Sequence, residues 1–192
     1  MQTIGSVKED LTTEKRISIT PETVKKFTDL RLSVSLEKSY GEHLGISDEE
    51  YKNKAANFHS SAKEVLKKSE IILKVNCPST DEINLIKDTS ILIGQFDPFS
   101  NKDMLNQLIK KGIRVFSLNL LPRITRAQSM DVLSSQANLS GYRAVIESVE
   151  EFGKVIPMMM TAAGTIMPAK VLVIGAGVAG LQAIATAKRL GG

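Results

Sequence analysis

Short apolar runs alternate with amphipathic, helix-forming segments over the first 120 residues of the chain. Each run has four or five residues, is rich in isoleucine, leucine and valine, and is followed by polar residues that can open a helix. The predicted strands cover residues 3–7, 32–36, 71–75, 91–94 and 113–116. Strands that alternate with helices are typical of a parallel sheet covered on both faces. The pattern therefore predicts an α/β fold with a doubly wound parallel sheet, in which ligands bind at the carboxyl ends of the strands.

Helix-start signals mark the segments between these strands. Thr20 is a good N-cap residue and Pro21 suits the first helical position, so a helix is predicted from residue 21. Ser47 precedes three acidic residues and predicts a second, short helix. Further helices are predicted at 62–68, from residue 80, and at 101–111. In the strand at 32–36 apolar residues alternate with polar ones, which predicts that one of its faces is exposed.

A longer helical pattern runs from Gln128 to Phe152. At about 1.5 Å per residue this helix would be about 38 Å long, enough to cross from one domain to another. Gly153 ends the pattern, and residues 154–168, which contain two prolines, are interpreted as a linker.

The segment 170–192 combines an apolar run with a glycine-rich motif. Val171–Ile174 predicts a buried strand, and GAGVAG follows it and opens a helical segment. In dinucleotide-binding proteins such glycines have separate tasks. Gly175 would allow the tight turn, Gly177 would let the backbone approach a pyrophosphate, and Gly180 would let the helix pack closely. The motif predicts the start of a Rossmann domain that binds a dinucleotide.

These patterns divide the chain into three parts: an N-terminal α/β domain at 1–125, a long helix and linker at 126–169, and the start of the NAD-binding domain at 170–192. The acidic residue that binds the adenosine ribose is expected about 20 residues beyond the glycines, past the last residue of this sequence. We therefore expect the chain to be the N-terminal piece of a longer protein and to bind a dinucleotide such as NADH weakly or not at all by itself.

Composition narrows the classes of function. The chain is 42% apolar and 24% charged, as in ordinary globular proteins, and its net charge of +4 comes from lysines interspersed with glutamates. This arrangement favours solvated helix faces over a nucleic-acid surface. Cys77 is the only cysteine, which excludes an internal disulfide and favours a reducing, cytoplasmic compartment. One cysteine and two separated histidines predict no zinc site, and no segment suits a signal peptide or membrane span.

The most specific stretch of the chain is LPRITRAQSMDVLSSQANLSGYRAV, at residues 121–145. Two further segments accompany it, KEDLTTEKRISITPE at 8–22 and MMMTAAGTIMPAKVLVIGAGVAGLQAIATAKRLG at 158–191. Together they closely resemble the alpha subunit of proton-translocating NAD(P) transhydrogenase. The resemblance extends over essentially the whole chain.

The resemblance implies a subunit that binds NAD(H) between its two domains. A beta subunit with a membrane domain would present NADP(H), and a hydride would pass directly between the two nicotinamides, coupled to proton translocation. The family relationship further implies a homodimer of the complete alpha subunit, in the cytoplasm and peripheral to the inner membrane. The chain alone is expected to be inactive.

The nicotinamide-binding loop of this family carries an arginine, a glutamine and an aspartate, which Arg123, Gln128 and Asp131 match. Arg123 and Asp131 could pair and hold the loop beside the ring, while Asp131 or Ser134 could bind the carboxamide. Gln128 could contact the second nucleotide without adding charge to the hydride path. Such a transfer requires proximity and exclusion of water, with no acid or base. The alternative interpretation of these residues is a capped helix start with a surface ion pair.

Alanine dehydrogenase, a related family with the same two-domain plan, is the second functional hypothesis. Its substrate-binding arginine and lysine match Arg16 and Lys74, but its catalytic histidine falls at Phe96 or Asp97. A phenylalanine cannot transfer a proton, and an aspartate with a pKa of about 3.9 suits the task poorly at neutral pH.

A third hypothesis is that the chain is an inactive remnant or an interaction module.

The only two histidines of the sequence do not supply the missing acid or base of alanine dehydrogenase. His43 and His59 are expected on the surface in helical or loop segments, away from the strand end that carries Phe96.

Overall fold

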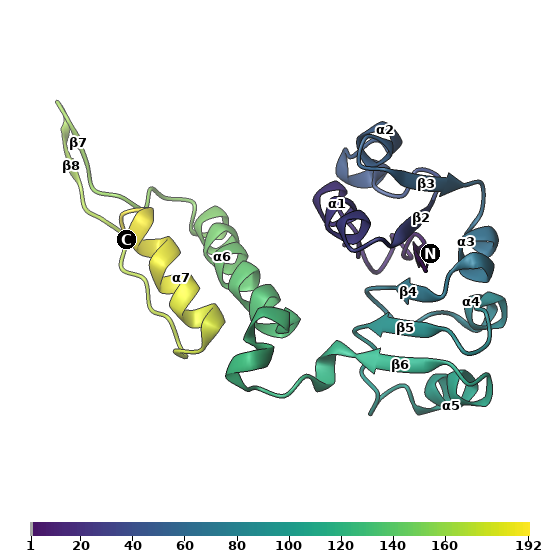
Figure 1. The fold of residues 1–192 in the computed structure, drawn as a ribbon. Coiled ribbons are helices and arrows are strands. Elements are labelled where there is room, and N and C mark those ends of the chain that lie inside the picture. Colours follow the sequence, from purple (N-terminus) through teal and green to yellow (C-terminus); the bar gives the residue numbers. More distant parts are fainter. Residues whose placement is uncertain (1) are drawn as a thin grey trace. The chain divides into compact units, whose positions relative to one another are not determined.

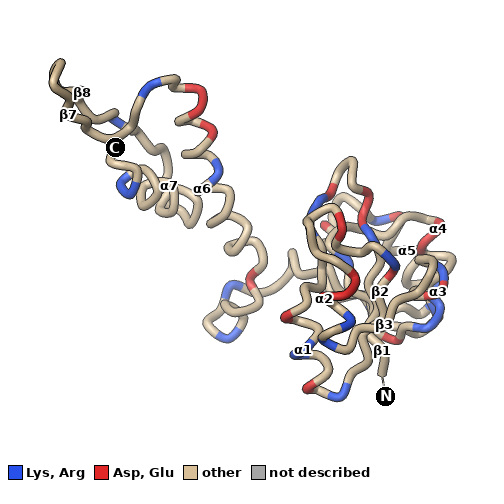
Figure 2. The backbone as a smooth tube through the Cα atoms, turned by 90° about the horizontal axis from the view of Figure 1, so that it is seen from above, with Lys and Arg blue, Asp and Glu red and all other residues tan. Residues whose placement is uncertain are grey.

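The computed structural model describes residues 2–192 of the chain. They form two compact units, one that ends at Leu121 and one that runs from Pro122 to Gly192 (Figure 1). The first unit contains a parallel sheet with helices, and the second contains two longer helices and a short hairpin. Charged residues of both signs are interspersed over the first unit, whereas long stretches of the second carry few charges (Figure 2).

Within the described residues, the first unit is built on six parallel strands in the order β3-β2-β1-β4-β5-β6 (Figure 1). Their bounds are β1 (Thr3–Ser6), β2 (Ser33–Glu37), β3 (Ala56–His59), β4 (Ile71–Leu73), β5 (Ile91–Gly94) and β6 (Arg114–Ser117). The chain winds outward from β1 to β3, returns to place β4 beside β1, and winds outward again to β6. This order confirms the predicted doubly wound parallel sheet and places its topological switch point between β1 and β4.

Helices connect successive strands and cover both faces of the sheet. Their bounds are α1 (Pro21–Asp29), α2 (Asp48–Lys52), α3 (Ala62–Lys68), α4 (Thr80–Leu85) and α5 (Lys102–Lys110), with the 3₁₀ turns η1 (Glu42–Leu44) and η2 (Leu118–Leu120). Buried side chains of α3, α4 and α5 form one apolar cluster with β4 and β5. Those of α1 and α2 form a second cluster with β1 and β2. Apolar burial on both faces is what stabilises a doubly wound sheet.

Polar caps start two of these helices where the sequence predicts them. α1 begins at Pro21, and the backbone N–H of Thr20 donates to Thr23 Oγ1 at 2.8 Å. α2 follows Ser47, whose Oγ accepts a hydrogen bond from the Glu50 N–H at 3.4 Å. Each cap depends on residues three positions apart, so the sequence alone locates it.

Strand β3 is missing from the sequence-based prediction. Its four residues, ANFH, include two polar side chains, so it lacks the apolar run that marks the other strands. It lies at the edge of the sheet, where polar residues are tolerated. His59, expected in a helix or loop, ends this strand; its Nδ1 lies 3.4 Å from Glu64 Oε2 and its Nε2 lies 3.4 Å from Ser35 Oγ.

Strand β2 is buried on both faces, which corrects the prediction that one face is exposed. Val34 and Leu36 are fully buried, and Ser35 on the opposite face is only 5% exposed. α1 and α3 both pack against β2. Because Ser35 is small and its hydroxyl has His59 as a partner, a polar position in the sequence is compatible with burial here.

The second unit consists of η3 (Thr125–Met130), α6 (Val132–Phe152), a hairpin of β7 (Met159–Thr161) and β8 (Gly164–Ile166), and α7 (Val178–Arg189). The long helix α6 therefore starts later than its predicted first residue, Gln128, because η3 occupies that stretch and Asp131 caps the helix. The hairpin lies within the residues interpreted from the sequence as a linker.

The prediction of a strand at Val171–Ile174 is wrong for this structure. Leu172 is 86% exposed and Ile174 is 92% exposed. A strand requires hydrogen bonds from a neighbouring strand, and none within residues 2–192 pairs with this segment. Val173 packs against the buried cluster of α6 and α7, whereas the side chains of Leu172 and Ile174 lie in solvent.

Helices α6 and α7 pack together at Gly141. A Cβ atom at this position would collide with the backbone of Ala179. Beside this contact, Val145 on α6 and Ala183 and Ala187 on α7 form a small buried cluster. A glycine within a helix weakens it, but this one allows the two backbones to approach.

Candidate functional site

The glycine motif forms an open turn at the start of α7. Gly175 has a φ of 104°, a conformation that side chains disfavour, and a Cβ at Gly180 would collide with the Gly175 carbonyl oxygen. A Cβ at Gly177, the N-cap residue, would have no neighbour within 4 Å, so the backbone is accessible there. The first turn of α7 has no acidic residue. An open helix N-terminus of this kind suits an anion such as a pyrophosphate.

A cavity of about 560 Å³ lies beside the loop that precedes α6. Its lining includes Arg123 and Gln128 from the loop, Asp131 and Ser134 from the start of α6, and Val178, the first residue of α7. The structure thus brings together the four polar residues that the sequence indicates in this region. The three glycines do not line the cavity, although Val178 lies directly after Gly177.

Asp131 organises the start of α6. Its Oδ1 accepts a hydrogen bond from the Ser134 N–H at 3.0 Å, and its Oδ2 accepts one from Ser134 Oγ at 2.6 Å. These two hydrogen bonds lower the pKa of the Asp131 carboxyl group, and the positive charge of Arg123 adds only a small further effect. No ion pair joins Arg123 to Asp131 in the described part of the chain, so the pairing expected between them is replaced by the cap. Gln128 and Arg123 are exposed.

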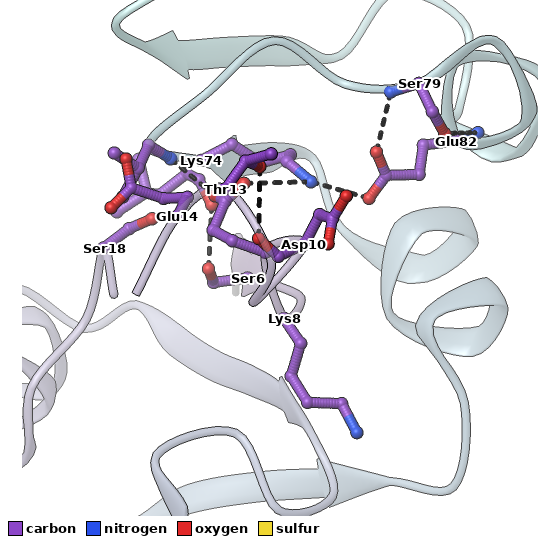
Figure 3. A network of polar contacts seen from close by, with 12 residues as sticks. Ser6, Lys8, Asp10, Thr13, Glu14, Ser18, Lys74, Ser79 and Glu82 are labelled. Carbon is purple, nitrogen blue, oxygen red and sulfur yellow. Dashed lines mark hydrogen bonds and ion pairs between the residues drawn. The ribbon is translucent and has the colours of Figure 1, made fainter. Parts of the chain in front are cut away.

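A second polar cluster lies in the first unit, where the chain leaves β1 and β4 (Figure 3). Lys74, whose side chain is 3% exposed, has its Nζ 2.6 Å from Glu82 Oε1 and 3.5 Å from Glu9 Oε2. The other oxygen of Glu9 accepts a hydrogen bond from the Val75 N–H at 2.7 Å. Burial raises the pKa of Glu9, and the charge of Lys74 opposes this effect. A cavity of about 420 Å³ adjoins the cluster.

Arg16, the other candidate for binding a substrate carboxylate, is paired within its own loop. Its Nε and Nη2 donate to the two carboxylate oxygens of Glu14 at 2.9 and 2.7 Å. Phe96 is fully buried in the core, and Asp97 is exposed with a φ of 38°. Both cations of the predicted alanine dehydrogenase site therefore have carboxylates of this chain as partners.

The two acidic partners of Lys74 cannot be identified from the sequence. Glu82 stands out there only as part of a helix start, and Glu9 only as part of a charged loop. The contact of Glu9 with Lys74 depends on how β1 and β4 pair in the sheet, because Glu9 is 65 residues from Lys74 in the sequence.

His43 is exposed, as expected from the sequence. Its Nε2 lies 2.8 Å from the Lys15 carbonyl oxygen.

The doubly wound sheet defines a protein of the α/β class, and the open glycine turn resembles the phosphate-binding turn of dinucleotide-binding proteins. Residues 5–140 match the family described as alanine dehydrogenase/PNT, N-terminal domain, and residues 144–192 match its C-terminal domain. The chain belongs to this alanine dehydrogenase/PNT family.

Several individual proteins are similar to the chain. An NAD(P) transhydrogenase subunit alpha protein from Rhodospirillum rubrum is 47% identical over 98% of this chain and 50% of the relative. A crystal structure of transhydrogenase from Sinorhizobium meliloti superposes with a TM-score of 0.94 at 45% identity, covering 99% of this chain and 57% of the other. An alanine dehydrogenase from Methanococcus maripaludis is 28% identical, over 98% of this chain and 51% of its own.

These similarities confirm the resemblance to the transhydrogenase alpha subunit. The chain spans about half the length of curated relatives that it matches, with 50% of the Rhodospirillum rubrum protein covered. Among residues 2–192, no helix is both long and apolar enough to cross a membrane. The same residues contain no group of three or more potential metal ligands from histidine, cysteine, aspartate and glutamate.

Proposed function

We propose that the chain forms the NAD(H)-binding part of a proton-translocating NAD(P) transhydrogenase alpha subunit. NAD(H) binds with its nicotinamide in the loop cavity and its pyrophosphate at the glycine turn, held by Gly175, Gly177 and Gly180. The hydride passes directly to or from NADP(H) on a beta subunit, which carries the membrane domain. The complete alpha subunit works as a homodimer at the cytoplasmic face of the inner membrane.

The observation that carries this proposal is the composition of the loop cavity. Among residues 2–192, Asp131 is the only carboxylate in its lining, and no histidine, lysine or cysteine lines it. Because its hydrogen bonds with Ser134 hold the pKa of Asp131 below the ordinary value, this carboxylate stays ionised at neutral pH and is a poor proton donor. A site with these groups suits a transfer that needs alignment and no proton chemistry.

Each polar residue of the cavity has a role that its position allows. Asp131 and Ser134 hold each other at the start of α6 and present acceptor oxygens to the nicotinamide carboxamide. Arg123 supplies positive charge at the mouth of the loop. Gln128 is exposed and uncharged, so it can contact the second nucleotide without perturbing charge along the hydride path.

Gln128→Ala tests the proposal in the protein that carries this chain, mixed with the NADP(H)-binding beta subunit. Hydride transfer from NADH to an NADP analogue should slow about tenfold or more, while the Kd for NADH changes less than about threefold. The matched control is Ser129→Ala, because Ser129 is the exposed neighbour of Gln128 and does not line the cavity. Equal losses in transfer rate and NADH affinity would contradict a role between the nucleotides.

An alanine dehydrogenase is the alternative function, favoured by the 28% identity to such an enzyme. It would require a cation free to bind a substrate carboxylate, and Lys74 and Arg16 are both engaged by carboxylates of the chain. The same protein assayed with pyruvate, ammonium and NADH distinguishes the two. Turnover of pyruvate without transfer to the NADP analogue would establish the alternative.

A further inference from the structure

The topological switch point of the sheet has a cavity of its own. In open α/β sheets ligands bind where the strand order reverses, at the carboxyl ends of the strands, and here this place lies between β1 and β4. Residues that follow these two strands, together with the start of α4, line a cavity of about 420 Å³. The fold therefore builds a pocket in the first unit, separate in sequence from the loop cavity of the second.

Lys74 is the central charge of this pocket. Its side chain is 3% exposed, and a buried ammonium group requires carboxylate partners because it has lost its water. Lys74 Nζ lies 2.6 Å from Glu82 Oε1 (Figure 3). The same nitrogen lies 3.5 Å from Glu9 Oε2. Glu9 is 5% exposed, whereas Glu82 is 21% exposed and forms the side of the cluster closer to solvent.

The carboxylate of Glu82 is held as a bound ligand carboxylate would be. One oxygen accepts from Lys74 Nζ at 2.6 Å, and the other accepts from the Ser79 backbone N–H at 2.8 Å. An ammonium group and a backbone N–H are a common pair of donors for a carboxylate. The hydrogen bond from the Ser79 N–H is part of the capping box of α4, so the start of this helix positions the Glu82 carboxylate beside Lys74.

We propose that Glu82, supported by Glu9, is a specificity-determining residue that occupies the carboxylate position of the Lys74 pocket and thereby excludes small carboxylic acids from the first unit. Removing the Glu82 carboxylate opens a site for a small monocarboxylate anion. The proposal is independent of hydride transfer, and its test contains no nucleotide.

Chemical rescue tests the proposal on the full chain. Glu82→Ala keeps Cβ, removes the rest of the side chain, which corresponds to acetate, and leaves Lys74 with a vacant position; propionate, one methylene longer, extends into the adjoining cavity. Added sodium propionate should raise the Tm of this variant by about 3 °C more than sodium chloride of the same ionic strength. The wild-type Tm should respond equally to the two salts, because Glu82 already fills the position.

Two further variants keep the test decisive. Lys74→Met combined with Glu82→Ala should lose the propionate-specific rise, because the ammonium group is gone. Glu82→Ser also shortens the side chain and leaves the position vacant, so it replaces Glu82→Ala if that variant does not fold, and it should also respond more to propionate than to chloride. A wild-type response as large as that of the variant, or no propionate-specific rise in either single variant, would overturn the proposal.

Discussion

Asp131 combines two tasks at one position. Its carboxylate caps α6 through Ser134, and it also lines the cavity proposed to hold the nicotinamide. The hydrogen bonds that cap the helix favour the ionised form and keep the pKa of Asp131 below its ordinary value of 3.8. The Asp131 carboxylate therefore both holds the start of α6 in place and stays ionised in the cavity.

Replacing Asp131 is expected to destabilise the second unit in a pH-dependent way. Asp131→Ala should lower the Tm at pH 7, because α6 loses its cap, and Asp131→Asn should lower it less, because an amide oxygen can still accept. The folded pKa lies below the unfolded pKa, so the stabilisation is fully present above about pH 4 and is lost as the pH falls through the folded value.

Urea unfolding of the wild-type chain and of Asp131→Ala, at pH 7 and at about pH 2.5, measures this effect. The difference between their midpoints should be larger at pH 7. A difference of the same size at both values would mean that the ionised carboxylate contributes nothing to the cap.

At the scale of elements, the packing of α6 against α7 depends on Gly141, which has no side chain. Gly141→Ala would place a methyl group against the backbone of Ala179. Because a backbone cannot rotate away as a side chain can, we expect a loss of about 1–3 kcal/mol in the unfolding free energy of the second unit.

Ser140→Ala is the control for this substitution, since Ser140 is the exposed neighbour of Gly141 in α6. Its effect should stay within about 0.5 kcal/mol. Denaturant titration followed by circular dichroism gives both values, and a Gly141→Ala variant as stable as the control would contradict the packing described for the two helices.

At the scale of the whole molecule, residues 155–187 carry one charged residue, Lys170, and much of this stretch is exposed to solvent. Met160, Met167, Leu172 and Ile174 are between 73% and 92% exposed. Large exposed apolar areas on soluble proteins mark interaction surfaces or lead to aggregation.

The chain by itself is therefore expected to self-associate as its concentration rises. Replacing both Leu172 and Ile174 with lysine should shift sedimentation toward the monomer, because both side chains lie in solvent. Leu30→Lys is the control, as Leu30 is 70% exposed but lies in the other unit. A monomeric wild-type chain, or an equal effect of the control, would contradict the prediction.

Across the molecule, the sequence predicts best what depends on nearby residues. The β-branched runs locate five strands, and Thr20 and Ser47 locate helix starts, because each signal is complete within a few positions. The sequence-based prediction fails where a neighbouring helix or strand decides whether a residue is buried. Burial of Ser35 requires a helix over each face of β2, and exposure of Leu172 requires the lack of a pairing strand within residues 2–192.

The candidate site follows the same division. The glycine turn can be predicted because φ at Gly175 is a local property, and the loop residues enter through their resemblance to a family. The engagement of Lys74 by Glu9 cannot be predicted from spacing, because it arises where β1 and β4, which are distant in sequence, become adjacent. Such non-local contacts decide whether a cation is available to a ligand.

The contact between Gly141 and Ala179 also fixes a distance within the second unit. Ala179 lies two residues after the N-cap glycine of α7, and Gly141 lies ten residues after Asp131, about 15 Å along the axis of α6. The closeness of the two backbones thus sets the separation between the turn proposed for the pyrophosphate and the loop proposed for the nicotinamide. A bulkier residue at 141 would move the glycine turn away from the loop that precedes α6. Residue 141 would therefore limit the length of the dinucleotide that fits between them, although it contacts no part of the proposed ligand.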